Sequence, residues 1–193
     1  MTRPQVVDGW RIDITARTGV ARVLTRRTCA LIVAAALRAA GAPNHASVTV
    51  ILMDDDEISG LNEAHLGHEG PTDVLSFPLL PPVAFPPHEG QTAHPTPADP
   101  APVELGSRPV SFVLPPRARP HLGDIAVSVE RAIAQAREGR GGQTGDLTWE
   151  PRDELRLLLT HGVLHLCGWD HAEPSEERAM RALEGRLLRD PLT

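Results

Sequence analysis

Three histidines near the C-terminus have the spacing of a metal site. They are His161, His165 and His171, within the segment HGVLHLCGWDH. Residues at positions i and i+4 of a helix share one face, so the imidazoles of His161 and His165 can reach one point. Gly168 lets the chain leave the helix sharply, and His171 can then swing back as a third ligand. Three imidazoles with an open fourth position are typical of catalytic zinc, although imidazole also binds nickel, copper and iron. We therefore predict one Zn²⁺ per chain, with other divalent transition metals as the alternative.

Two other interpretations of this segment depend on single residues. The metzincin zinc proteases share its histidine and glycine spacing, but Gly162 stands where their general-base glutamate would be. Because glycine has no proton-transfer group, peptidase chemistry is disfavoured. A structural zinc site would need a fourth ligand, most often a cysteine, and Cys167 is the nearby candidate. Its place on the helix between Leu166 and Gly168 favours a small buried residue instead.

The general base cannot be assigned from the sequence. Asp170 is the carboxylate nearest to the histidines, and orienting an imidazole is favoured for it over proton transfer. Three further candidates stand at the ends of expected strands, where Asp and Ser also serve turns and caps. They are Asp73, Ser76 and Asp124. Trp149 and Trp169 could stack on bases, but packing is the favoured role for both.

A helical C-terminal third must position the histidines. A long helix is expected over 151–167, because acidic residues occupy its first turn and Gly168 follows its last residue. An amphipathic helix is expected over 174–188. Its solvated face is expected to include Glu173, Glu176 and Glu177.

Upstream of these helices, strands and helices follow one another without strict alternation. Strands are expected over 47–53, 74–77 and 125–129, with a strand pair or one bulged strand within 6–14. Helices are expected over 24–40, 57–65 and 130–140, the second of them capped by the acidic run that begins at Asp54. We predict an α+β fold in a single domain over 1–193. It should have a mixed, mostly parallel sheet of four to five strands, about five helices, and the metal site on a C-terminal helix and the turn after it.

Residues 79–120 differ from the rest of the chain. They hold 12 of the 19 prolines, a composition that interrupts regular elements. We predict a Pro-rich surface insertion here, within which residues 110–114 could form a strand.

Composition alone argues against a nucleic-acid partner. The chain of 193 residues has a formal net charge of −6, and aromatic residues make up 3% of it. All 19 of its basic residues are Arg. Phosphate contacts need clustered cations, and single-strand binding often uses stacking rings. Cys29 and Cys167 are expected to be free thiols. Neither an apolar run of membrane-spanning length nor a signal peptide is visible, so a cytoplasmic protein without a membrane partner is expected.

Three sequence motifs nevertheless favour a nucleic-acid substrate, because they occur in the same order as in a known family. The segment from His161 to His171 resembles the signature H-G-x-L-H-L-x-G-x-D-H of the YbeY family of bacterial metal-dependent endoribonucleases. The segments PTDVLSFP (71–78) and LGDI (122–125) resemble two further family motifs. The resemblance covers about residues 6–188, apart from the Pro-rich insertion.

The resemblance implies an endoribonuclease that acts on single strands. It implies a role in ribosomal RNA processing, notably at the 3′ end of 16S rRNA, and in ribosome quality control. His161, His165 and His171 would be the zinc ligands. Ribosomal RNA and the small ribosomal subunit are the expected partners, with ribosomal proteins or assembly GTPases as further ones. Attack on the phosphodiester by water and attack by the 2′-hydroxyl both stay open.

The chain departs from the family where a basic stretch would precede the PTDVLSFP segment. Leu66 occupies the place of an Arg, and His68 that of a Lys. Another arginine could supply the positive charge for RNA contact. The candidates are Arg108, Arg117 and Arg119. One Arg-lined cleft with a dication can bind phosphate despite a negative net charge. A zinc hydrolase of a non-RNA substrate and a ribosome-assembly factor with structural zinc are the alternative functions.

Overall fold

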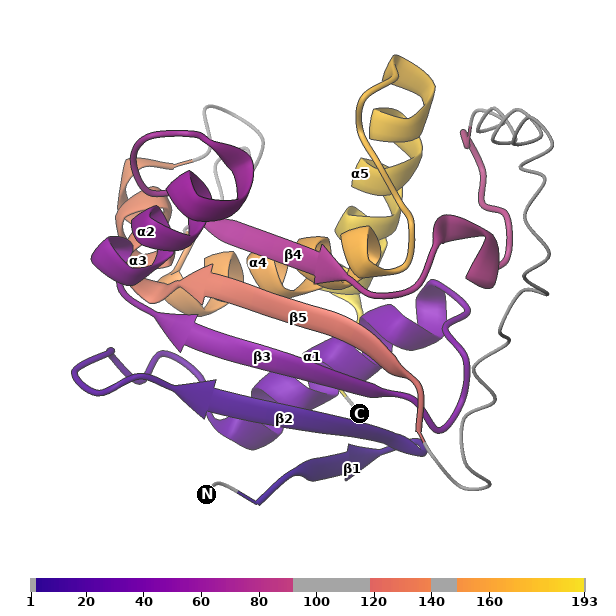
Figure 1. Cartoon of the computed structure of the whole chain (residues 1–193), viewed down its shortest axis with the longest axis horizontal. Coiled ribbons are helices and arrows are strands. Elements are labelled where there is room, and N and C mark those ends of the chain that lie inside the picture. The colour runs from indigo at the N-terminus through magenta and orange to yellow at the C-terminus, as the bar shows by residue number, and fades with distance from the viewer. Residues whose placement is uncertain (1–2, 92–118, 140–148, 193) are drawn as a thin grey trace, which may run out of the picture.

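The computed structural model describes residues 3–91, 119–139 and 149–192 (Figure 1). The strand predicted over 110–114 and most of the Pro-rich insertion lie outside them. The described strands are β1 (Gln5–Val7), β2 (Trp10–Ala16), β3 (Ser47–Met53), β4 (Val74–Pro78) and β5 (His121–Ser128). The α-helices are α1 (Arg26–Ala39), α2 (Asp55–Leu66), α3 (Val129–Glu138), α4 (Pro151–Leu166) and α5 (Pro174–Arg189), and Pro82–Ala84 forms a short 3₁₀ helix, η1.

The five strands form one mixed sheet in the order β1-β2-β3-β5-β4. The central strands β2, β3 and β5 run parallel, and the edge strands β1 and β4 pair antiparallel with their neighbours. The predicted α+β class with a mixed sheet is therefore confirmed. The N-terminal segment is a strand pair, because Asp8 and Gly9 both have positive φ, as a tight two-residue hairpin turn requires.

Strand β5 begins at His121, earlier than the sequence predicted. Gly123 lies inside this strand, at a bulge where His121 and Gly123 pair with the consecutive residues Ser47 and Val48 of β3. Its φ is 146°, and a Cβ there would lie 2.2 Å from the carbonyl oxygen of Phe77. The glycine therefore allows β4 to pair closely with β5 along the edge that faces the site.

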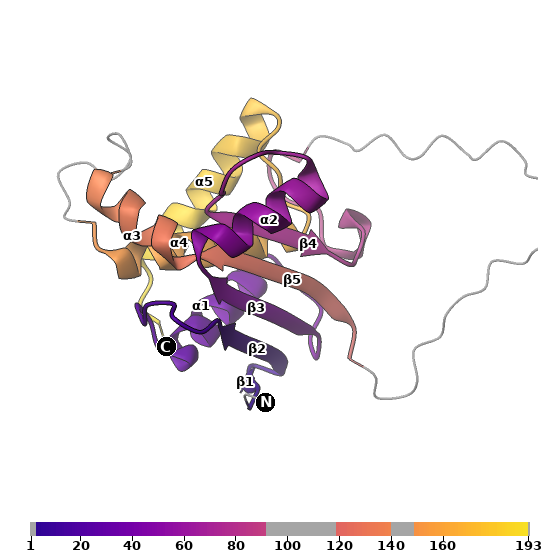
Figure 2. The ribbon, with the colours of Figure 1, turned by 60° about the vertical axis from the view of Figure 1, so that its left-hand side comes forward.

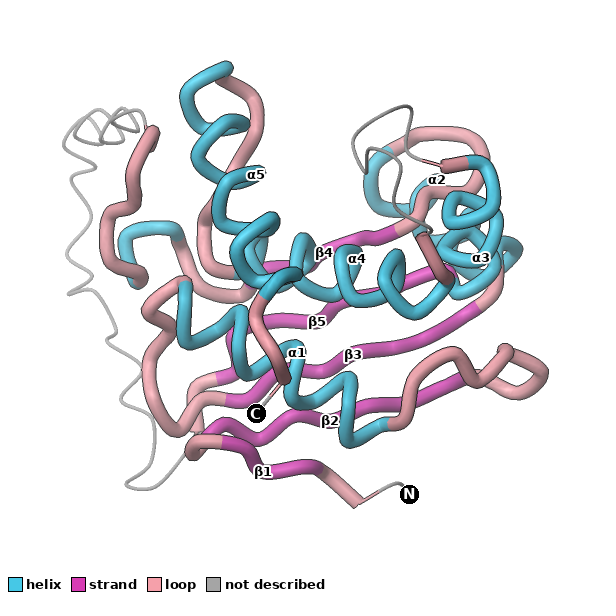
Figure 3. The backbone as a smooth tube through the Cα atoms, turned by 180° about the vertical axis from the view of Figure 1, so that it is seen from behind, coloured by secondary structure: helices cyan, strands magenta, loops and turns pink. Residues whose placement is uncertain are grey.

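Helices cover both faces of the sheet. Helices α1, α4 and α5 lie on the face of the sheet that is turned toward the viewer in Figure 3. There α4 buries Leu155, Leu159 and Val163 in the main core, with Ile125 and Val127 of β5. Helix α2 crosses the other face (Figure 2), where Ile58 belongs to a smaller apolar cluster. The alternation along β5 thus separates two cores, and α4 is fixed by the larger one.

Caps set the helix boundaries within a few residues of the expected ones. Asp54 accepts a hydrogen bond from the backbone N–H of Glu57 at 2.9 Å, so the acidic run is a helix cap, as predicted. Thr25 caps α1 by accepting from the backbone N–H of Thr28 at 3.0 Å. One expectation was wrong: Glu176 is only 3% exposed, because it lies on the face of α5 that packs against the body.

The start of the Pro-rich segment packs against the body. Phe85 is 6% exposed and belongs to the main core, an anchor that the composition of the segment did not indicate. Residues 119–120 lead back into β5. Within the described ranges, no helix has the length and apolar character needed to cross a membrane.

Candidate metal centre

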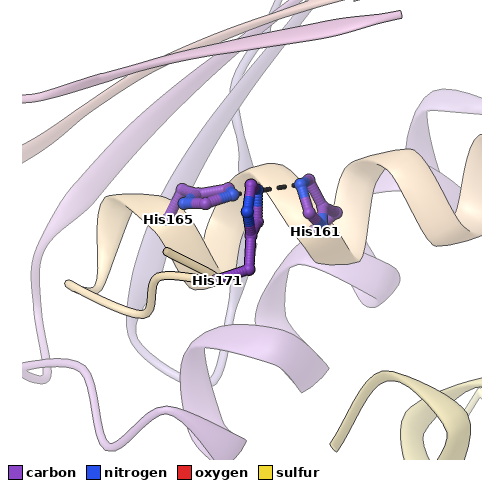
Figure 4. Close-up of side chains that lie close together, drawn as sticks. All are labelled: His161, His165 and His171. Atoms are coloured by element: carbon purple, nitrogen blue, oxygen red, sulfur yellow. Dashed lines mark hydrogen bonds between the residues drawn. The ribbon is translucent and has the colours of Figure 1, made fainter. Parts of the chain in front are cut away.

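The three histidines converge as their spacing predicted. His161 and His165 project from α4, and His171 reaches the same point from the turn that follows (Figure 4). One nitrogen from each ring lies within 4.8 Å of the other two. The Nε2 atoms of His161 and His165 are 3.0 Å apart. This group can hold a metal ion.

The turn after α4 has the geometry that aims His171. Gly168 has a φ of 81°, the left-handed conformation that glycine adopts without strain. Its N–H donates to the carbonyl of His165 at 3.1 Å, and the N–H of Trp169 donates to that of Leu164 at 3.0 Å. These two bonds form a Schellman motif, which ends the helix and reverses the chain. The N–H of His171 then donates to the carboxylate of Asp170 at 2.7 Å.

A buried carboxylate orients the first histidine. Glu184 of α5 is 9% exposed, and its Oε1 lies 2.7 Å from Nδ1 of His161. A proton on Nδ1 donates to this carboxylate and leaves the lone pair of Nε2 facing the other histidines. Sequence reasoning missed Glu184. The available signal was its place on the buried stripe of α5, in line with Glu176 and Met180.

Burial keeps the second histidine neutral. Burial, which is the largest cause, and the neighbouring His161 and His171 together lower the pKa of His165 to about 4. A neutral imidazole is the form that binds a metal ion, so the site favours the ligand state of this ring at neutral pH.

Gly162 has a packing role. A Cβ at this position would lie 2.8 Å from Cγ2 of Ile125 and 3.1 Å from Cγ2 of Val74. The hydroxyl of Ser76 donates to the carbonyl of Gly162 at 3.0 Å. Helix α4 therefore touches β4 and β5 at this glycine, where the metzincins carry their base.

Cys167 is not part of the described ligand group, which consists of the three histidines. It is 1% exposed, and burial raises the pKa of its thiol to about 12. Its place in the main core favours packing over metal binding. Cys29 is likewise a buried free thiol, as expected.

The histidines form one wall of a cavity of about 960 Å³. Asp73, Ser76 and Asp170 line it, whereas Asp124 does not. The carboxylate of Asp124 lies 2.9 Å from Nε2 of His121. Asp73 accepts from the N–H of Val74 at 2.9 Å, and from the side chain of Gln135 at 3.1 Å. Asp73 and Ser76 therefore face the cavity, and their hydrogen bonds also stabilise the local structure.

The wall opposite the histidines carries little charge. It includes His65, Leu66 and His68, and Leu66 is 56% exposed. Among its described lining residues, this cavity has no Arg or Lys. A smaller cavity of about 210 Å³ beside His161 and His171 includes Arg181. The guanidinium of Arg181 binds the carboxylate of Glu177 at 2.6 Å.

The arginines proposed as substitutes do not line the cavity where the structure describes them. Arg119 donates to the carbonyl of Gly9 at 2.6 Å, at the turn between β1 and β2. Arg108 and Arg117 lie outside the described residues. Trp169 does line the cavity, with His88 stacked on its ring. Trp149 instead donates to Glu154 at 2.5 Å, at the start of α4.

Comparisons with known proteins agree with the motifs. A family model described as "Endoribonuclease YbeY" matches residues 13–191. The chain is similar to Endoribonuclease YbeY of Salinispora tropica, with 40% identity over 153 residues, 79% of this chain and 79% of that protein. It is 32% identical to the protein of that name from Roseiflexus castenholzii over 179 residues, 92% of this chain and 90% of that protein. The solution structure of TM1509 from Thermotoga maritima has a similar fold, with a TM-score of 0.50 and 22% identity, covering 92% of this chain and 86% of that chain.

Proposed function

This chain belongs to the endoribonuclease YbeY family, and from that premise we propose that it is a zinc-dependent endoribonuclease acting on single-stranded RNA. Family membership supports the endoribonuclease role. The observation that carries the metal dependence is the convergence of His161, His165 and His171 on one point at the wall of an open cavity. These three residues would hold one zinc ion.

The donor set fits zinc. Three imidazole nitrogens leave room for a further ligand, and the carboxylate of Glu184 orients one of the rings, as it does in many zinc sites. Zinc held here supplies Lewis-acid chemistry, polarising a phosphoryl oxygen and making water more acidic at neutral pH.

The residues of the chain have separate tasks in this proposal. Glu184 holds the proton on Nδ1 of His161 and so keeps Nε2 available as a ligand. Asp170 fixes the backbone of the turn that presents His171, which supports an orienting role over that of a base. His65 and His68 offer ring N–H groups to phosphate oxygens from the opposite wall.

Cleavage assays on labelled RNA test the activity. We expect the purified protein to cleave a single-stranded oligonucleotide and to leave the matching duplex intact. Cleavage should stop with EDTA and in His165→Ala. Equal cleavage by the wild type and His165→Ala would identify a contaminating nuclease and overturn the proposal. The product ends identify the nucleophile, because attack by the 2′-hydroxyl leaves a 2′,3′-cyclic phosphate and attack by water does not.

Ribosomal RNA is the substrate we propose, specifically the 3′ end of 16S rRNA during maturation and quality control of the small ribosomal subunit in the cytoplasm. Ribosomal proteins or assembly GTPases are the proposed further partners. The resemblance of the three motifs supports this. Cells depleted of the protein should accumulate 16S rRNA with an extended 3′ end, and the wild-type gene but not the His165→Ala gene should restore the mature end.

One observation favours a second candidate, a zinc hydrolase with a non-RNA substrate. The described lining of the main cavity has no Arg or Lys, so phosphate attraction there depends on imidazoles and the metal. Zinc binding by the wild type without cleavage of any RNA, but with hydrolysis of an ester, would support this alternative. Cys167 lies in the main core and outside the described ligand group, which counts against a structural zinc site closed by cysteine.

A further inference from the structure

The third histidine lies on an exposed part of the chain. Residues 170–174 are all exposed, whereas the helix that carries His161 and His165 is packed into the main core. Between the end of α4 and the start of α5, the backbone of His171 is held by its own neighbour, Asp170. The position of His171 therefore depends on what holds the two flanks of this turn.

The start of the Pro-rich segment contacts the first flank. We call residues 79–91 the strap. The ring of His88 stacks on that of Trp169, with centroids 3.9 Å apart and an angle of 9° between the planes. Nε2 of His88 lies 3.3 Å from the carbonyl oxygen of Gly168. Pro82 lies against the same glycine, where an added Cβ would be 3.0 Å from the Cβ of Pro82.

The strap also contacts the second flank. Gly90 lies so close to the first turn of α5 that an added Cβ would be 2.6 Å from the carbonyl oxygen of Ser175 and 3.0 Å from the Cβ of Ala179. The strap is itself fixed at its start, since the N–H of Leu79 donates to the carbonyl of Leu122 at 2.9 Å. Phe85 anchors its middle in the main core.

We propose that the strap positions the third metal ligand, with His88 acting as a positioning residue through its stack on Trp169. The inference rests on the proposed metal site but not on the identity of the substrate. Contacts on both sides of the turn hold Trp169 and Ser175 at fixed places, and His171 lies between them. Without the stacking contact between His88 and Trp169, Trp169 can move. The imidazole of His171 then samples positions from which it cannot bind the metal together with His161 and His165.

Zinc affinity, measured by competition with a chromophoric chelator, tests this inference. We expect His88→Ala to bind zinc about fivefold to tenfold more weakly than the wild type, as for the loss of one aromatic pair. His88→Phe keeps a flat ring over Trp169 and should stay within about twofold of the wild type by the same argument. Val83→Ala is the matched control, because Val83 is in the strap but is 86% exposed, and its affinity should not change.

A second variant approaches the strap from its other end. Gly90→Val places a side chain against Ser175 at a φ of 80° and should lift the strap from α5. It should reproduce the affinity loss of His88→Ala, and the double variant should lose little more than either single one. X-ray absorption at the zinc edge should count fewer imidazoles in both variants than in the wild type.

The outcomes separate the inference from the proposed function. Unchanged zinc affinity in His88→Ala would overturn the inference. So would a lower melting temperature of the metal-free protein with no change in zinc affinity, since that identifies a role in folding alone. A wild type that binds zinc but cleaves no RNA would remove the proposed function and leave the inference standing.

Discussion

The two walls of the main cavity are built differently. Two of the three histidines of the first wall belong to α4, whose buried side chains fix them in the main core, and Glu184 contacts His161 from behind. The residues of the opposite wall, His65, Leu66 and His68, are all exposed. A substitution on the first wall disturbs both packing and ligand geometry, whereas one on the second changes what the cavity offers to a substrate. We therefore expect metal binding and substrate preference to respond to different substitutions.

The sharpest test of the histidine wall is His165→Ala. It removes one of three ligands, and we expect zinc affinity to fall by at least about 100-fold and RNA cleavage to fall to background. Zinc content after dialysis and the cleavage rate measure this. His45→Asn is the control, because it removes a histidine outside the site and keeps a residue type tolerated at a φ of 63°. A zinc-loaded, active His165→Ala would contradict the assignment of this wall.

Glu184→Ala tests how much the hydrogen bond between Glu184 and His161 contributes to zinc affinity, compared with the histidines themselves. It frees Nδ1 of His161 from its partner, and we expect zinc to bind about tenfold more weakly. Glu184→Gln should recover part of the loss, because its amide oxygen still accepts the hydrogen bond without carrying charge. Glu63→Gln, at an exposed position of α2, should have no effect in the same titration. Equal affinity in wild type and Glu184→Ala would show that the ring is held by packing alone.

Leu66→Arg tests the exposed wall. A cation at this exposed position should strengthen RNA binding a few-fold at low salt, and steepen the slope of log affinity against log salt by about 0.7 for a single strand. Leu66→Glu should weaken binding. Zinc affinity should stay the same in both variants, because the packing of α4 is not touched. A large change in zinc affinity would show that the two walls are coupled.

The smallest expected effect concerns the thiols. Burial raises the pKa of Cys29 to about 11 and that of Cys167 to about 12. Since the thiolate is the reactive form and a raised pKa keeps the thiol protonated, neither cysteine should react with Ellman's reagent in the native protein at about pH 8. Both should react after unfolding in guanidinium. Rapid reaction of Cys167 in the native state would mean that the histidine wall opens.

Local spacing was enough to predict the parts of the site that lie close together in sequence. The helical repeat places His161 and His165 on one face, and Gly168 marks the turn that brings His171 back. The bounds of β3 and the cap at Asp54 were also predicted from short-range signals. Nothing beyond neighbouring residues is needed for these features.

Features that depend on distant contacts were not predictable in this way. The bond between Glu184 and His161 requires α5 to fold back on α4, and the pattern of α5 alone does not reveal its partner. Phe85 enters the core from a segment whose average composition indicates a surface loop. The early start of β5 at His121 was not predicted either, because the close approach of Gly123 to Phe77 comes from the pairing of two strands.

The contact at Gly162 separates this chain from the zinc proteases that share its histidine spacing. A glutamate introduced there would have to displace Ile125 and Val74 before its carboxylate could approach the metal ligands. A glutamate at this position therefore requires the side chains of Ile125 and Val74 to give way first. Evolution along that route would need smaller side chains at Ile125 of β5 and Val74 of β4 before a glutamate at Gly162, and a designer who wanted the protease base would have to make the same changes first.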